Sequence, residues 1–229
     1  MEISHLLYKV RNLNKSVDFF IKKGFNVEFG KDKNPYNALI YFLDGKYIEL
    51  IENMNMSILA KVFLTMIGRR KFVCSLSKQE KANEGFIRMA MHIEENQVDY
   101  IKKLYKSEFQ ENAFSVTVKR KDIHGNNLTC KCVFPNDSKL PFFNTKLLGG
   151  NNIWEVEHPN KVLGIKKIIY GASDKEYNFL KKICTDKAMK IDNSGEGIKF
   201  IDFYYDDKNI SNKILYKNGW VIEDDDYKS

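Results

Sequence analysis

The sequence lacks the long apolar run that a membrane-spanning helix needs. None of its 229 residues lies in a stretch that approaches the ~18 apolar residues of such a span. Residues 1–10 also lack the charged and apolar regions of a secretory signal peptide. These two absences predict a cytoplasmic protein with no membrane partner.

Several signatures of catalysis and binding are missing as well. The chain has no glycine-rich phosphate loop, no G-x-S-x-G turn and no Cys/His nucleophile pattern. Its net charge is +7, but the lysines are scattered and the tightest basic cluster is residues 69–71. Because no helix-turn-helix, zinc-finger or RNP-like pattern accompanies them, we expect a solvated basic surface and no nucleic-acid partner.

Cysteine is scarce, with four residues in the chain. Only Cys130 and Cys132 are close in sequence, and a C-x-C pair alone lacks the spacing of a four-ligand thiolate site. We expect reduced, structural thiols.

What is present is a strand, a helix and three further strands in residues 1–53. Apolar side chains alternate over residues 6–10, which is the period of a half-buried strand. Asn14 can cap a helix that ends at Gly24. Alternating segments at 25–29, 38–42 and 46–52 follow, with an Asp-Gly hairpin turn before the last.

Residues 86–146 repeat this order. A strand at 86–93 precedes a helix capped at Asn96, and strands at 114–119 and 128–134 flank a turn. The segment LPFF at 140–143 supplies the last strand. The sequence therefore predicts two similar modules.

Four other segments lie outside the modules. An apolar helical stripe at 58–67 is typical of a core or lid helix, with protein interaction as the alternative if it is exposed. Residues 69–85 favour a polar, partly helical connection between the modules. Residues 161–223 predict a further α+β unit, in which Ser173 and Glu176 form a capping box. Residues 224–229 are expected to be a solvated tail.

The order of these features resembles the vicinal oxygen chelate superfamily and, within it, the glyoxalase-like domain proteins. The resemblance rests on a His that opens the first strand, VRNLNKSVDFF at the helix entry, GF after the helix, YIEL on the fourth strand, and LPFF followed by HPN. It covers residues 3–160. It implies an α+β fold in which paired βαβββ modules, 1–53 and 86–146, place curved mixed sheets around a cavity. The C-terminal strand-helix-strand unit would pack on this 1–160 region.

The resemblance also implies a metal-dependent chemistry. Superfamily members bind a divalent metal with a His of the first strand and a Glu of the fourth, which correspond to His5 and Glu49 here. Glu49 would double as the catalytic base, and manganese, zinc, nickel and iron are the candidate metals. The reaction would be that of a lyase, isomerase, dioxygenase or thiol-transferase. A homodimer is a candidate assembly, because superfamily members often dimerise.

The second module does not supply matching ligands. Alignment of the two modules sets Arg88 against His5, and Asn144 and Thr145 stand where relatives carry a carboxylate. His92 lies on the same strand face as Arg88 and would complete a His5, His92 and Glu49 set in another register.

The alternative is a metal-free, non-catalytic protein that binds an anionic small molecule. Arg88, His92, Asn144 and Thr145 would then be its binding residues, and Glu49 would orient the ligand or pair with Arg88. A purely structural buried pair between Glu49 and Arg88 is the third reading.

Overall fold

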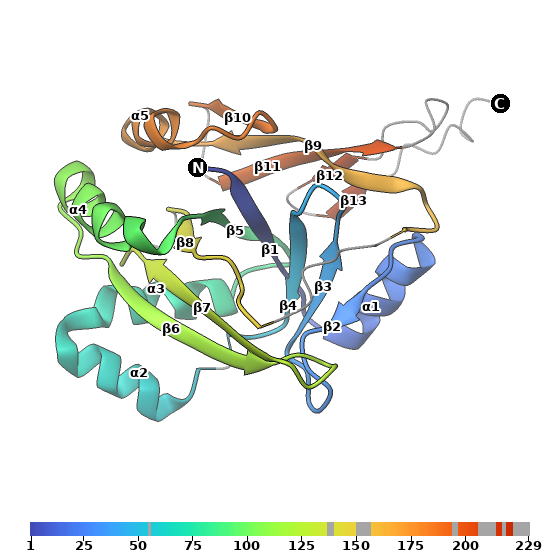
Figure 1. The fold of residues 1–229 in the computed structure, drawn as a ribbon, viewed down its shortest axis with the longest axis horizontal. Coiled ribbons are helices and arrows are strands. Elements are labelled where there is room, and N and C mark those ends of the chain that lie inside the picture. The colour runs from blue at the N-terminus through green and yellow to red at the C-terminus, as the bar shows by residue number, and fades with distance from the viewer. Residues whose placement is uncertain are drawn as a thin grey trace.

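The computed structural model describes residues 1–54, 56–136, 140–149, 157–193, 197–205, 214–216 and 219–221. The expected tail at 224–229 lies outside these residues. The described chain is α+β and contains both expected modules (Figure 1). The first consists of β1 (Ile3–Lys9), α1 (Leu13–Lys22), β2 (Glu28–Phe29), β3 (Asn37–Tyr41) and β4 (Tyr47–Ile51). The second consists of β5 (Gly85–His92), the 3-10 turn η2 (Glu95–Gln97), α4 (Val98–Phe109), β6 (Phe114–Lys121), β7 (Asn127–Phe134) and β8 (Phe142–Asn144).

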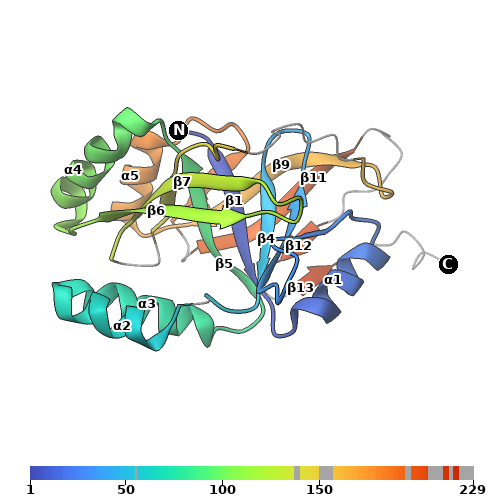
Figure 2. The same cartoon turned by 60° about the horizontal axis from the view of Figure 1, so that its bottom comes forward.

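The two modules share one curled, eight-stranded sheet with the order β2-β3-β4-β1-β5-β8-β7-β6. The first strands of the modules, β1 and β5, pair antiparallel at its centre. Within each module the last strand runs parallel to the first, β4 beside β1 and β8 beside β5. The β6–β7 hairpin curls away from the centre of the sheet, so the sheet forms half of a barrel (Figure 2).

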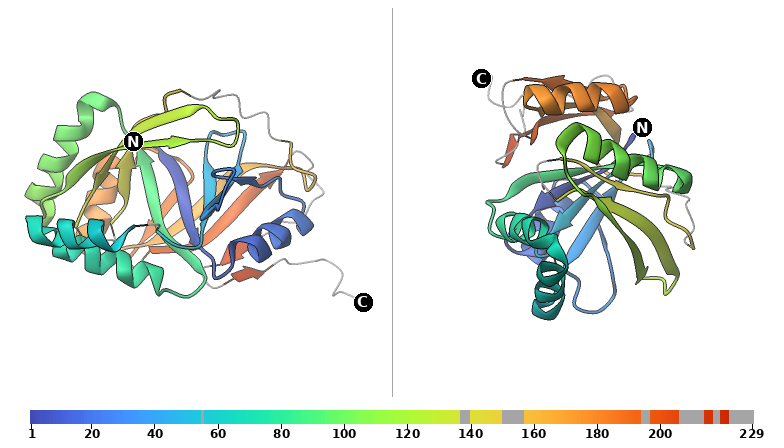
Figure 3. Two further views of the ribbon diagram at one scale, coloured as in Figure 1. Left: turned by 90° about the horizontal axis from the view of Figure 1, so that it is seen from below. Right: turned by 90° about the vertical axis from the view of Figure 1, so that its left-hand side faces the viewer.

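A second sheet covers the outer face of this half-barrel. It has the order β10-β9-β11-β12-β13, built from β9 (Val162–Gly171), β10 (Met189–Asp192), β11 (Gly197–Tyr205), β12 (Ile214–Tyr216) and β13 (Gly219–Val221), with α5 (Asp174–Ile183) beside it. The right-hand view of Figure 3 shows the two layers, and the main hydrophobic core lies between them. The rings of Phe42 and Phe203 lie 5.6 Å apart across it, and those of Tyr105 and Phe179 lie 5.4 Å apart.

The connection between the modules is helical. α2 (Ile58–Leu64) leads through a π-turn, η1 (Thr65–Arg69), into α3 (Arg70–Glu80), so residues 69–85, expected to be a polar and partly helical connection, are mostly helical. The sequence of α3 is mostly polar, but the helix has a narrow buried face that includes Phe72 and Leu76. The apolar stripe on α2 and η1 contributes no buried residue, so the prediction that it belongs to the core was wrong.

The helix caps also needed correction. Asn12, not Asn14, caps α1, because its side chain accepts a hydrogen bond from the Lys15 amide at 2.9 Å. Glu94 and Gln97 form the capping box before α4, in place of Asn96. The capping box of Ser173 and Glu176 on α5 is confirmed.

Candidate functional site

The inner face of the half-barrel, which points away from the second sheet, brings His5 and Glu49 together. Strands β1 and β4 are parallel neighbours, and Leu7 lies opposite Glu49 in their register. His5 is two residues before Leu7 and therefore shares its face. The His5 Nε2 atom lies 3.6 Å from the Glu49 Oε2 atom.

Three neighbours fix the orientation of this pair. The His5 ring stacks on Tyr47 at 4.4 Å and meets Phe142 edge-on at 5.4 Å. The Asn37 side chain donates to Glu49 Oε1 at 2.8 Å. His5 is 5% exposed, whereas the Glu49 side chain retains 18% of its surface. Glu49 is therefore the member of the pair that a ligand can reach from solvent.

Arg120 is the functional candidate that sequence reasoning missed. It comes from β6, the edge strand at the far end of the sheet from β2. Its Nη1 atom donates to the carbonyl oxygen of Gly30, next to β2, at 3.4 Å, and it also hydrogen-bonds the Tyr41 side chain. The guanidinium thus reaches from one edge of the curled sheet to the other, and its positive charge acts to lower the pKa of both His5 and Glu49.

Burial and this charge set the protonation of the pair. Burial lowers the pKa of His5 to about 3, with further lowering from the nearby His92 and Arg120. Burial raises the pKa of Glu49, against the opposing effects of the Asn37 hydrogen bond and the Arg120 charge. At neutral pH His5 is therefore a neutral imidazole, with Ser4 Oγ 2.9 Å from its Nδ1 atom.

Arg88 occupies a different environment from the one expected. It is buried, its Nε atom donates to the Leu140 carbonyl at 3.1 Å, and its guanidinium lies 5.2 Å from the centre of the Phe142 ring. Glu49 contacts His5 and Asn37 instead. The structure therefore does not form the expected Glu49–Arg88 pair.

The remaining predicted residues lie together where β5 meets β8. His92 and Asn144 are register partners, and the Asn144 amide donates to the Thr145 carbonyl at 3.1 Å. The Thr145 hydroxyl accepts from the Lys131 amide at 3.0 Å and so serves the backbone. Within the described chain, His92 Nδ1 and Asn144 Oδ1 are buried and have no hydrogen-bond partner. Such atoms are costly to bury unless a ligand or water satisfies them.

The register of the second module shows what replaces the metal donors. In the first module Leu7 is the register partner of Glu49, and His5 lies two residues before Leu7. In the second module His92 faces Asn144, so the counterpart of the His is Ala90. If Phe142 is taken as the counterpart of Glu49 instead, its register partner is Ala90, and the counterpart of His5 is Arg88. Neither frame supplies an imidazole or a carboxylate.

The donor set therefore does not fit a resident divalent metal. Protein metal sites of this kind use at least three side-chain ligands. Among the residues that the structure describes, no three His, Cys, Asp or Glu side chains gather closely enough to hold an ion. The neighbouring Arg120 cation would also repel a divalent metal at His5 and Glu49.

The H-P-N segment after the second module is structural. His158 is buried, its Nδ1 atom accepts from the Asn26 amide at 2.9 Å, and its Nε2 atom donates to the Tyr41 carbonyl at the same distance. Asn160 donates to the Lys23 carbonyl at 2.9 Å. These contacts tie the start of the second sheet to the first module.

A family model for the glyoxalase-like domain matches residues 3–181 of this fold. The chain belongs to the glyoxalase-like domain family. The resemblance seen in its sequence is thereby confirmed, and the match extends beyond residue 160 into the second sheet. Comparison with curated protein sequences gives no significant match.

Two solved structures have the same fold as this glyoxalase-like domain protein. A hypothetical protein from Staphylococcus aureus is 19% identical with a TM-score of 0.54, over 94% of this chain and 85% of that one. A xylose isomerase-like TIM barrel/4-hydroxyphenylpyruvate dioxygenase fusion protein is 11% identical with a TM-score of 0.51, over 90% of this chain and 36% of that one. At these identities the likeness shows the fold alone.

Proposed function

We propose that the inner face of the half-barrel binds a small anionic molecule without a resident metal. The observation that carries this proposal is Arg120, a partly buried cation of the inner face whose positive charge acts on both His5 and Glu49. A guanidinium presents a planar fork of donors that suits a carboxylate or phosphate. The protein would thus recognise charge with a side chain in place of an ion.

The surroundings of Arg120 favour a ligand with an apolar or aromatic body. The rings of Tyr47, His5 and Phe142 follow one another across the inner face, and Phe134 stacks on Phe142 with centroids 5.1 Å apart. Flat rings of this kind provide stacking surfaces for a planar ligand. The unpaired buried atoms of His92 and Asn144 would then supply hydrogen bonds to a polar group at its other end.

A second candidate function uses Glu49 as a general base. A raised pKa brings a carboxyl group closer to the range in which it exchanges protons at neutral pH. The partial exposure of Glu49 allows its carboxylate to contact a ligand. The His5 ring is neutral, so it adds no positive charge that would compete with the ligand for this carboxylate. Under this reading the protein is an acid–base enzyme that acts on the bound anion.

The binding proposal is tested by NMR titration of chelator-treated protein with benzoate and with its neutral isostere, benzamide. We expect benzoate, but not benzamide, to shift resonances of Tyr47 and Phe142. Arg120→Gln should weaken benzoate binding about tenfold or more, the order expected for loss of a charge-assisted hydrogen bond. Lys119→Gln is the matched control, because it removes an exposed cation one position earlier on the same strand. Equal affinities in Arg120→Gln and wild type would overturn the proposal.

Glu49→Gln separates the two functions. If Glu49 is a base, this variant retains benzoate binding, and it loses the hydrogen–deuterium exchange that wild type catalyses at the acidic C–H of a bound phenylpyruvate. If wild type catalyses no such exchange above the rate in buffer, the enzyme reading fails for this substrate class and the binding reading stands.

A further inference from the structure

The segment formed by α2 and η1 turns its largest apolar side chains to solvent. They recur at helical spacing and so share one face. Their exposed fractions run from 49% to 82%, and no residue of α2 or η1 is buried. We call this face the outer stripe; it consists of Ile58, Leu59, Val62, Phe63, Met66 and Ile67.

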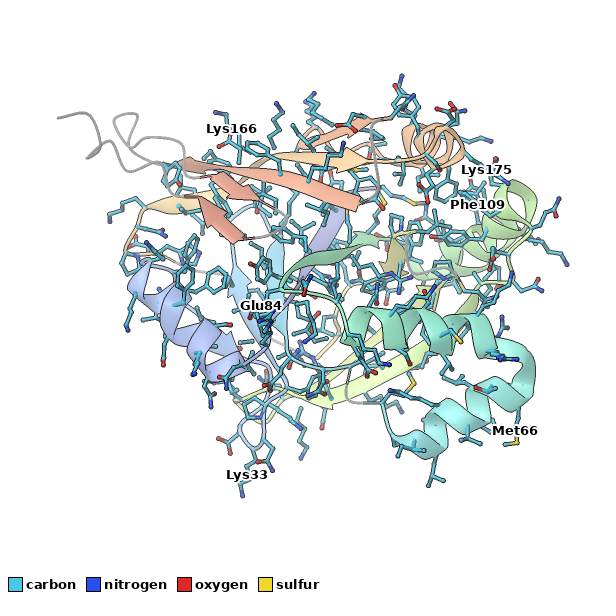
Figure 4. All side chains as sticks on the ribbon, turned by 180° about the vertical axis from the view of Figure 1, so that it is seen from behind. Lys33, Met66, Glu84, Phe109, Lys166 and Lys175 are labelled. Carbon is cyan, nitrogen blue, oxygen red and sulfur yellow. The ribbon has the colours of Figure 1, made fainter. Side chains whose placement is uncertain are left out.

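The outer stripe reverses the usual arrangement of a helix in a globular protein. A helix as short as α2 normally owes its stability to burying its apolar face. Here the polar side faces inward instead, since the Lys61 ammonium group contacts the Glu80 carboxylate on α3 at 2.7 Å. Figure 4 shows Met66 at the outer end of this hairpin, far from Lys166 on β9. The described part of the chain places nothing over the outer stripe.

The sequence that carries the outer stripe is basic. Residues 53–79 contain five basic residues and no Asp or Glu. Arg70, Lys71 and Lys78 are exposed; Lys71 shows 81% of its side chain to solvent although its ammonium group lies 3.6 Å from the Glu111 carboxylate. A helix that presents an apolar face beside a cationic cluster has the composition of helices that lie in the interface of an anionic bilayer.

We propose that an anionic lipid bilayer covers the outer stripe and that the protein docks on such a surface through α2 and η1. The absence of a long apolar run, which led us to expect no membrane partner, excludes only a span. Indeed, no helix of the described residues could cross a membrane. A helix lying in the surface needs no span, because only one of its faces enters the lipid.

Charge also argues against a second copy of this chain as the occupant. A two-fold dimer sets the same patch of both subunits against itself. Such a dimer would bring two clusters around Arg70 and Lys71 together, and like charges at close range repel. An anionic surface instead attracts every one of them.

The test is flotation with vesicles of phosphatidylcholine alone and with one quarter phosphatidylglycerol. We expect wild type to float with the anionic vesicles and Leu59→Ser/Phe63→Ser to remain in solution. Both residues are exposed, so this variant should keep the wild-type circular dichroism spectrum and thermal midpoint. Ile21→Ser/Leu148→Ser, which removes two exposed apolar side chains from other parts of the surface, should float as wild type does.

A charge pair completes the test. Attraction by an anionic surface is worth a factor of about five in affinity per basic residue, so Arg70→Ser/Lys71→Ser should weaken vesicle binding roughly 25-fold. Lys166→Ser/Lys175→Ser should not. Failure of wild type to float, equal flotation with neutral vesicles, or flotation of Leu59→Ser/Phe63→Ser would overturn the proposal. So would a wild-type dimer that binds no vesicle and becomes a monomer in that variant, because the outer stripe would then be a dimer interface.

Discussion

Protonation of His5 should destabilise the protein as the pH falls. The pKa of His5 drops from 6.5 in the unfolded chain to about 3 in the folded one, so the unfolded chain binds more protons between these values. The contribution of His5 to the free energy of unfolding is fully present above pH 6.5, and it is lost as the pH decreases toward 3. For a single group whose pKa falls in this way, the loss is on the order of 1 kcal/mol at pH 5.5 and on the order of 3 kcal/mol at pH 4.5.

The assay is urea unfolding at pH 7.5, 5.5 and 4.5. His5→Phe retains a ring to stack on Tyr47 but cannot take up a proton, so its stability should fall less with pH than that of wild type, by the amounts above. His124→Asn, in the exposed turn between β6 and β7, should keep the wild-type slope. If His5→Phe and wild type lose stability in parallel, then His5 is not a buried neutral imidazole and the electrostatic description of the pair is wrong.

Two substitutions test the packing that supports the site. Gly24→Ala should lower the free energy of unfolding by about 1–2 kcal/mol, because Gly24 has a left-handed backbone. The variant should lose more stability through a clash, since the added Cβ would lie 2.8 Å from the Cβ of Asn160. Gly45 has a similar backbone with open space around it, so Gly45→Ala shows the backbone cost alone in the same urea titration. Phe203→Ala should lower the free energy of unfolding by about 3–5 kcal/mol, because it leaves a cavity in the core between the sheets. Phe19 is half exposed and serves as the control. An equal loss of stability in Phe19→Ala would mean that the layers do not pack as described.

The sequence predicted the order of elements well because local signals mark each one. The Asp-Gly turn, the stop at Gly24 and the alternating strands act over a few residues and need no knowledge of the fold. The extent of α3 was harder to predict, because its two buried apolar residues, Phe72 and Leu76, are few beside its polar composition. Sequence reasoning also placed the cap of α1 two residues late, because Asn12 and Asn14 are equally good caps by type.

The candidate site was half predictable. The resemblance to the glyoxalase-like domain proteins implied that His5 and Glu49 meet, and the parallel pairing of β1 with β4 brings them together. Arg120 shares a strand face with Val116 and Val118, a pattern visible in the sequence. Its arrival beside Glu49, however, depends on how far the sheet curls, which is a property of all eight strands. The expected Glu49–Arg88 pair failed for a different reason, because Leu7 of β1 is the register partner of both residues and so lies between them.

The central claim is that a side-chain cation, not a metal, completes this inner face. Calorimetric titration of chelator-treated protein with manganese, zinc, nickel and iron(II) tests it most directly. We predict no stoichiometric binding, because His5 and Glu49 offer two ligands beside a positive charge. Stoichiometric binding that disappears in both His5→Ala and Glu49→Gln would contradict the account and assign the site to a metal.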